Sequence, residues 1–239
     1  MALELDAVVF DVADAMSAAT FWAGMLERSV RLEPGGASVP GDATQVGLRF
    51  VTSRTEQAGP RHLHLLLTSS SAEDQQAIVE RALELGGRHL DVGQGPEEPF
   101  VVLADPQGNE LCIIEPGNAY LAGTGTLGEV TCDGAPAVGR FWRDALGWPL
   151  VLDEQGQTAV QSPLGGTKIS WDSWEEDPPR PAHRRNRQRF DLICTEPEIE
   201  VERLLALGAT RREDQDGHLE LADPGGHEFG LRRSSSTTR

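Results

Sequence analysis

Three side chains whose chemistry suits catalysis or metal binding stand in separate apolar segments of the sequence. They are Asp11 in VVFDV, His64 in RHLHLLL and Cys112 in NELCII. A carboxylate beside an imidazole raises the imidazole pKa and poises it near neutrality, so Asp11 and His64 form a candidate acid–base pair. Zinc accepts oxygen, nitrogen and sulfur donors, so all three residues form a candidate metal site. The simpler interpretations also stay open: a hydrogen-bonded structural histidine and a small apolar cysteine.

The sequence contains an internal repeat, and the repeat shows which elements must position these side chains. Three segments recur in the same order at nearly constant spacing. They are Phe21-Trp22 and Phe141-Trp142, the helix-like segments 80–86 and 202–208, and the ADPQGNE and ADPGGHE turns at 104–110 and 222–228. Repeats of this kind indicate duplication of one structural unit. The turn-rich stretch 116–125 predicts the boundary between the two copies.

Each copy has the pattern of an α+β fold in which βαβββ occurs twice. Alternation of Val8, Phe10 and Val12, and of Leu63, Leu65 and Leu67, with the residues between them predicts half-buried strands. Helical spacing predicts a helix over 16–27. Ser70 with Glu73, and Thr195 with Glu198, predict capping boxes for two later helices. Weaker strands are expected near 30–33 and 45–52, and a last strand near 111–114.

The sequence resembles the glyoxalase/bleomycin-resistance/dioxygenase (vicinal oxygen chelate) superfamily. The resemblance rests on VVFDVADAMSAATFW, RHLHLLL, ERALELGG and VLADPQGNELCII, and on their counterparts GEVTCDGAPAVGRFWRDALGW and LADPGGHEFGLRR. It implies two tandem domains, each of two βαβββ modules that form a cupped mixed sheet with helices on the outside and ligands in the cup. We expect domain 1 at 1–117, a linker at 118–126, domain 2 at 127–233 and a disordered tail at 234–239.

Period-two alternation assigns side chains to the faces of these strands without help from the family. Apolar residues are expected behind the sheets, against the helices: Phe10, Leu63, Leu65, Leu67, Leu111, Ile113, Phe190, Leu192, Phe229 and Leu231. Asp11, His62, His64 and Cys112 are expected to face the first cup, with His62 near the exposed strand end. Glu129, Thr131, Arg187, Arg189 and Asp191 are expected to face the second cup.

The resemblance also implies where a metal would be bound. Metal-dependent members place a histidine on the first strand, a histidine on the strand that opens the second module, and a glutamate on the last strand. Here these positions hold Ala7, His64 and Cys112 in the first copy, and Leu127, Arg189 and Gly230 in the second. Neither copy retains the ligand set, so no cofactor is expected, and a divalent metal is disfavoured.

The amino-acid composition restricts the kinds of molecule that the protein is expected to bind. The net charge of −17 opposes general binding to nucleic acid or to an anionic membrane. No apolar run is long enough for a membrane span. Three scattered cysteines and a start without signal-peptide features favour the cytoplasm. A monomer is expected, because the fused domains can replace a homodimer.

The favoured function is metal-independent binding or sequestration of a small, partly aromatic or anionic molecule. Trp171 and Trp174 offer stacking surface for such a ligand. Arg187 and Arg189 suit a carboxylate or phosphate, or pair structurally with Glu129 or Asp191. The alternatives are an enzyme, either a metal-free lyase or isomerase that uses Asp11 and His64 or a metal enzyme with unusual ligands, and a protein-interaction module.

Overall fold

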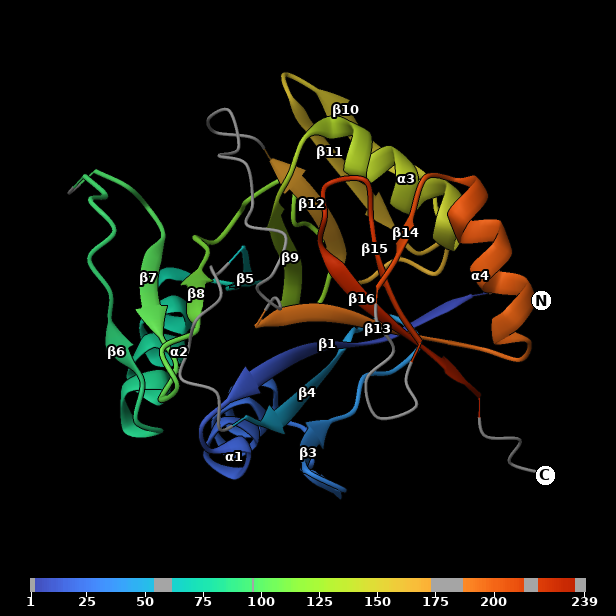
Figure 1. The fold of residues 1–239 in the computed structure, drawn as a ribbon. Coiled ribbons are helices and arrows are strands. Elements are labelled where there is room, and N and C mark those ends of the chain that lie inside the picture. The colour runs from blue at the N-terminus through green and yellow to red at the C-terminus, as the bar shows by residue number, and fades with distance from the viewer. Residues whose placement is uncertain (1–2, 54–61, 96, 173–186, 213–218, 235–239) are drawn as a thin grey trace.

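The computed structural model describes residues 3–53, 62–95, 97–172, 187–212 and 219–234. This part of the chain forms two eight-stranded mixed sheets and four helices (Figure 1). The fold is therefore α+β, as the sequence predicts. Trp174 and residues 235–239 of the predicted tail lie outside the described residues. No described helix is long and apolar enough to cross a membrane.

The strands of the two sheets come from both halves of the chain. The first sheet contains, in spatial order, β14 (Thr210–Arg211), β15 (Leu219–Ala222), β16 (Glu228–Arg233), β13 (Gln188–Cys194), β1 (Glu4–Val12), β4 (Gly47–Thr52), β3 (Gly36–Val39) and β2 (Arg31–Glu33). The second contains β10 (Leu150–Glu154), β11 (Gln157–Gln161), β12 (Lys168–Asp172), β9 (Leu127–Asp133), β5 (Leu63–Leu67), β8 (Glu110–Ile113), β7 (Val101–Ala104) and β6 (Arg88–His89).

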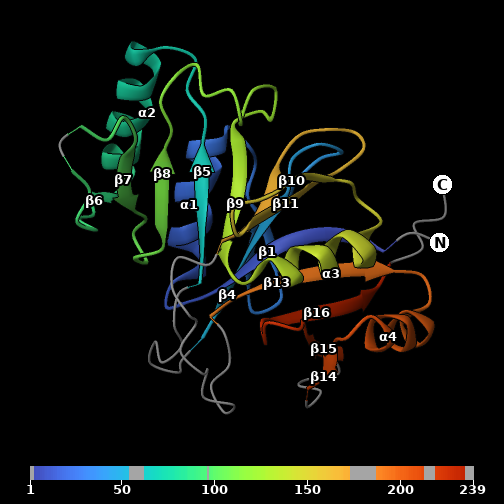
Figure 2. The ribbon, with the colours of Figure 1, turned by 90° about the horizontal axis from the view of Figure 1, so that it is seen from above.

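Each sheet therefore joins one βαβββ module of the first copy to one module of the second. In the first sheet β1 pairs antiparallel with β13, and Val8 lies opposite Phe190. In the second sheet β5 pairs antiparallel with β9, and Leu65 lies opposite Val130. Figure 2 shows the strands of the two sheets running across each other. The expectation that each copy closes its own cup is wrong, because the first strand of each module pairs with a module from the other copy.

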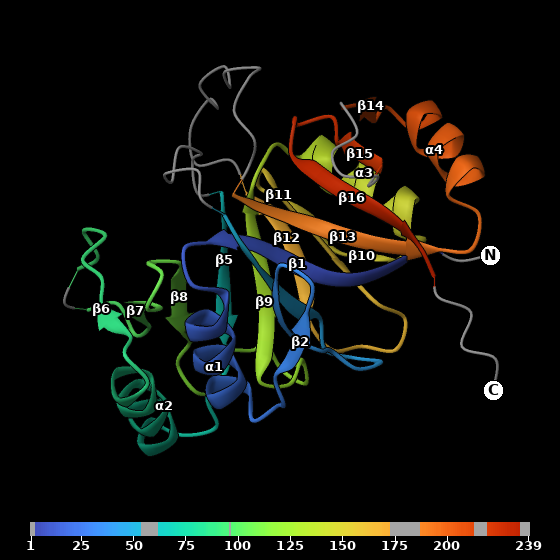
Figure 3. The ribbon, with the colours of Figure 1, turned by 60° about the horizontal axis from the view of Figure 1, so that its bottom comes forward.

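The helices cover one face of each sheet and share a hydrophobic core. They are α1 (Ala15–Leu26), α2 (Ala72–Glu84), α3 (Pro136–Leu146) and α4 (Pro197–Ala206). Helix α1 packs against β3 and β4, and α3 packs against β10, β11 and β12 (Figure 3). Trp142 on α3 stacks on Trp171 of the second sheet and also contacts Phe190 and Phe229 of the first. One core thus connects the helix-covered faces of both sheets.

The repeated sequence motifs hold the two modules of each copy together. The indole Nε1 of Trp22 donates to Oδ2 of Asp105 at 3.0 Å, and Trp142 makes the same bond to Asp223 at 3.0 Å. Each aspartate also accepts backbone N–H bonds within its own turn. The FW and ADP motifs recur because they form one buried contact in each copy.

Local predictions differ from the structure mainly at element ends. The cap of α2 is Ser71, whose Oγ accepts from the backbone N of Asp74, one residue later than the predicted box. Helix α4 begins after Glu196 without a side-chain cap, so Thr195 does not act as one. Strand β3 was not predicted, because its sequence, GASV, shows no clear alternation.

Candidate functional site

The face of each sheet that carries no helix is called its open face here, and it is where a ligand would bind. The residues predicted to lie behind the sheets all belong to the main hydrophobic core. Strand parity therefore assigns their faces correctly. The pairing of modules then decides which polar residues share an open face, and this grouping differs from the predicted one.

Asp11 and His64 lie on different sheets. Asp11, on β1, accepts a hydrogen bond from Arg189 of β13 at 2.8 Å, with Arg189 only 9% exposed. The acids that bear on His64, on β5, are Glu110 and Asp133. The predicted Asp11–His64 pair is therefore wrong, and burial lowers the pKa of His64 where a raised value was expected.

The open face of the first sheet is dominated by ion pairs. Arg49 contacts three carboxylates: Asp6 at 3.0 Å, Glu33 at 2.8 Å and Asp191 at short range. Arg232 contacts Asp6 at 2.6 Å and Asp191 at 3.4 Å. We call these five residues the first-sheet ion network. A cavity of about 370 Å³ borders it, and Asp6, Glu33 and Arg49 are among the residues that line this cavity.

The first sheet does not fit the family's metal. Ala7 has no donor atom in its side chain, and Arg189 is paired with Asp11. At Gly230, an added Cβ would lie 2.6 Å from Oδ1 of Asp191, so the Asp191 carboxylate occupies the space of that ligand position. Asp191 in turn is held by Arg49 and Arg232. The polar groups here neutralise one another.

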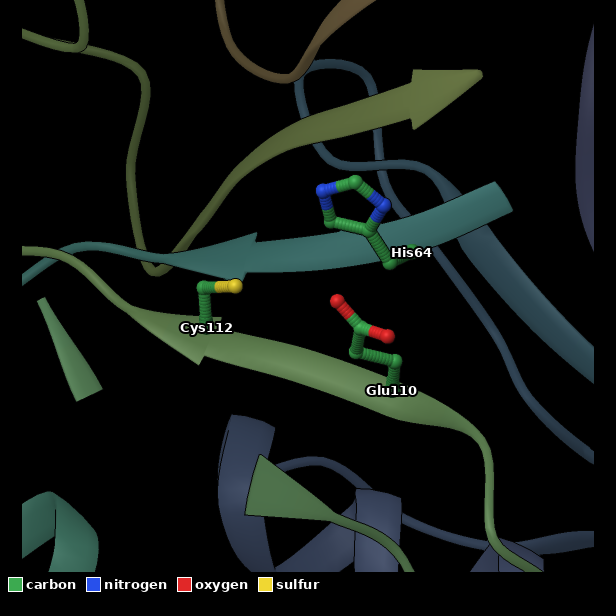
Figure 4. Close-up of side chains that lie close together, drawn as sticks. All are labelled: His64, Glu110 and Cys112. Carbon is green, nitrogen blue, oxygen red and sulfur yellow. The ribbon is translucent and has the colours of Figure 1, made fainter. Parts of the chain in front are cut away.

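The open face of the second sheet brings three possible metal ligands together. His64 comes from β5, and Glu110 and Cys112 from the neighbouring strand β8 (Figure 4). The parallel pairing of Leu65 with Leu111 and of Leu66 with Cys112 sets this register. One ligand atom of each residue lies within 4.8 Å of the others. We call these residues the His64–Glu110–Cys112 cluster.

Burial shapes the protonation of this cluster. Desolvation lowers the pKa of His64, although Glu110 and Asp133 oppose this, so the imidazole is favoured as the neutral form that binds metals. Burial, assisted by the charge of Glu110, raises the pKa of the Cys112 thiol to about 12. Cys112 also packs in a small apolar cluster with Val102, Ile114 and Leu121, which agrees with its interpretation as a wall residue.

A cavity of about 370 Å³ lies on the same open face, over β9 to β12. It is lined by Tyr120, Glu129, Thr131, Leu152, Gln157, Ser170, Trp171 and Asp172. Thr131 lies opposite His64 on one side and Ser170 on the other. The cavity therefore adjoins the His64–Glu110–Cys112 cluster along one row of the sheet.

The segment between the two copies supplies one wall of this cavity. The Tyr120 hydroxyl donates to Oε1 of Glu129 at 2.7 Å. Lys168 Nζ donates to the backbone carbonyl of Tyr120 and lies 3.8 Å from the centre of its ring. Burial raises the pKa of Glu129, although Tyr120, Ser170 and Lys168 favour its charged form. Burial also raises the pKa of Tyr120 and lowers that of Lys168.

Several predicted site residues have other roles. His62 is not exposed but 5% accessible, and it stacks on His227 at 4.7 Å. Trp171 is 1% accessible and belongs to the core, so it offers a ligand little stacking surface. Arg187 is buried, and its carbonyl accepts from the backbone N of Asp11.

Four residues at this face were not among the predicted site residues: Glu110, Tyr120, Ser170 and Lys168. Glu110 shares the parity of Cys112, so alternation along NELCII contains the signal that could have identified it. Tyr120 has no such signal, because it lies in a segment without regular structure.

The second sheet fits a divalent metal better than the family positions alone suggest. Imidazole, carboxylate and thiolate are all zinc ligands, and three of them converge here. Only His64 matches the family's residue type at its position. Cys112 replaces the glutamate, and Glu110 lies outside the family's ligand positions.

Comparisons with known proteins identify the family. The glyoxalase-like domain matches residues 7–114 and again 129–232. Glyoxalase I from Zea mays superposes with a TM-score of 0.66 at 13% identity, covering 96% of this chain and 92% of that one. A putative dioxygenase from Bacillus subtilis gives a TM-score of 0.58 at 15% identity, covering 97% and 85%.

At these identities the two structures show a shared fold and nothing finer. No curated protein matches the chain significantly. The matched domain, however, covers most of both halves of the sequence, in the order that the internal repeat predicts. The chain belongs to the glyoxalase-like domain family, as a tandem member with two copies of the domain.

Proposed function

We propose that the protein binds a small organic molecule in the cavity on the open face of the second sheet. One observation carries the proposal: the cavity combines apolar walls with hydrogen-bonding groups that converge on it. Shaped apolar pockets with a few polar groups are typical of small-molecule sites. The cavity of the same volume beside the first-sheet ion network is a weaker candidate. A charged ligand there would have to compete with ion pairs that the protein already forms.

The lining favours a ligand with a positive charge or several hydrogen-bond donors. Glu129 and Asp172 supply carboxylates, Thr131 and Ser170 supply hydroxyls, and no arginine or lysine belongs to the described lining. Lys168, which lies nearby, already donates to Tyr120. An anionic ligand, which Arg187 and Arg189 had suggested, has less support, because Arg189 pairs with Asp11.

The test compares three probes of similar shape in a thermal-shift assay: benzyltrimethylammonium, benzyl alcohol and phenylacetate. We expect stabilisation by the cation, less by the alcohol and none by the carboxylate. Leu152→Trp fills the cavity and should remove the effect. Val151→Trp, at a neighbouring exposed position outside the lining, is the matched control and should retain it. Equal stabilisation of the Leu152→Trp variant, or preference for phenylacetate, would contradict the proposal.

Catalysis by the Asp11–His64 pair is not part of this proposal, because the two residues lie on different sheets.

We further propose that the protein is a monomer and that it functions in a reducing cytoplasm. Each sheet already joins modules from both copies, so a second chain is not needed to complete it. The three cysteines are buried and free, which suits a reducing compartment. A sizing experiment that gives a dimer would contradict the monomer.

A further inference from the structure

The His64–Glu110–Cys112 cluster brings three side chains of metal-ligand type together on one face of the second sheet. Within the described part of the chain, none of the three side chains forms a hydrogen bond. His64 and Glu110 are half-buried and Cys112 is buried, so a cation bound between them would give all three side chains a shared partner. Figure 4 shows the Glu110 carboxylate pointing from β8 toward His64 on β5, with the Cys112 sulfur to one side.

The spacing suits a single small cation. Zinc bonds of about 2.0 to 2.3 Å place neighbouring donor atoms about 3 to 4 Å apart. The donor atoms here lie no more than 4.8 Å apart, so small side-chain rotations bring them into range. Strands β5 and β8 fix the backbone on both sides, because they are adjacent in the middle of the second sheet.

The donor types point to a particular class of metal. Magnesium and calcium prefer oxygen ligands, whereas thiolate together with imidazole selects zinc and similar ions. We propose that His64, Glu110 and Cys112 bind one thiophilic divalent cation of the zinc type. The cavity that Thr131 and Ser170 line lies beside this cluster, because Thr131 is the neighbour of His64 on β9.

This inference stands apart from the proposed ligand. The cation binds without any organic molecule, and the cavity binds its ligand over β9 to β12 without needing the cation. Failure of either experiment leaves the other interpretable.

The experiment uses cobalt(II) as a spectroscopic substitute for zinc. The full chain, stripped with a chelator and kept reduced, is titrated with cobalt under anaerobic conditions. We expect one equivalent of cobalt to bind. Its absorption spectrum should show visible bands typical of cobalt(II) in a ligand environment of low symmetry, and a near-ultraviolet thiolate-to-cobalt charge-transfer band. Zinc should displace the cobalt, while excess magnesium should not.

The chain provides its own controls, because Cys132 and Cys194 are also buried and free. Cys112→Ser and Cys112→Ala should lose the charge-transfer band, and Cys132→Ser and Cys194→Ser should retain it. Even outer-shell changes at metal sites cost about tenfold to a hundredfold in affinity, so His64→Ala and Glu110→Gln should each weaken cobalt binding at least about tenfold. Circular dichroism and thermal denaturation verify that each variant is folded.

Three results would overturn the assignment. They are absence of stoichiometric cobalt binding to the folded wild type, a charge-transfer band that survives in both Cys112 variants, and a Glu110→Gln variant with unchanged affinity. Each removes either the site or one of its three ligands.

Discussion

On the open face of the first sheet, arginines meet carboxylates at nearly every polar position, and Arg49 alone contacts three of them. On the open face of the second sheet, polar groups surround a cavity, and the His64–Glu110–Cys112 cluster is left without hydrogen-bonded partners in the described chain. Both faces derive from the same duplicated pattern. The contrast indicates that polar residues on the first face stabilise the fold, while those on the second remain available to a ligand.

The scaffold of the two copies, by contrast, is nearly the same. Trp22 binds Asp105 and Trp142 binds Asp223 with equal distances. The difference between the faces therefore arises from a few side chains on a shared framework. Four changes test this comparison, from the largest expected effect to the smallest.

The largest effect is expected for the shared scaffold. Asp105 and Asp223 each accept four hydrogen bonds, including one from a buried tryptophan. Asp105→Ala and Asp223→Ala should each lower the free energy of unfolding by roughly 4 kcal/mol or more, because buried donors lose their acceptor. Urea denaturation measures this. Clearly unequal losses would show that the copies do not share one scaffold.

The second-largest effect on stability is expected for the first-sheet ion network. Arg49→Met removes the arginine that contacts Glu33 and leaves Asp6 and Asp191 with Arg232 alone, so it should cost about 3 kcal/mol of unfolding free energy. Arg140→Met breaks an exposed ion pair with Asp153 and should cost less than about 1 kcal/mol. Cobalt binding should be unchanged in both. A cost for Arg49→Met no larger than that for Arg140→Met would remove the structural role of the network.

On the open face of the second sheet, removing the charge of Glu129 should stabilise the protein, whereas removing that of Arg49 on the first sheet should destabilise it. Burial raises the pKa of this carboxyl in the folded protein, so ionising it costs stability as pH rises from the unfolded pKa of about 4.3 through the folded value. Glu129→Gln removes this cost and still accepts from Tyr120. The variant should gain melting temperature relative to wild type as pH rises over that window, whereas exposed Glu80→Gln should not. A difference that does not change with pH would contradict this account.

The smallest effect compares two helix starts. Ser71→Ala removes the cap of α2 and should cost about 1 kcal/mol. Helix α4 has no side-chain cap, so Glu196→Ser should stabilise the protein by roughly 0.5 to 1 kcal/mol. Chemical denaturation distinguishes the two signs. Destabilisation by Glu196→Ser would show that Glu196 stabilises the helix start in some other way.

Local patterns in the sequence predict much of the fold and part of the site. Alternation places Leu63, Leu65 and Leu67 in the core correctly, and it turns His64 and Cys112 to the opposite face. The expectations that His62 is exposed and that Trp171 offers stacking surface are wrong, because the burial of both depends on neighbours from distant segments. Tyr120 could not be predicted, since its contact with Glu129 depends on the path of an irregular segment.

The sequence by itself determined the duplicated α+β modules, the faces of their strands and the family, because alternation, helix periodicity and turn chemistry act over a few residues. Only the tertiary structure decided that β1 pairs with β13 and β5 with β9. The opening strands of all four modules have similar alternating patterns, so no local signal selects among their possible partners. That choice places Asp11 beside Arg189 and His64 beside Thr131, whereas the pairing of β5 with β8 inside one module brings His64 to Glu110 and Cys112.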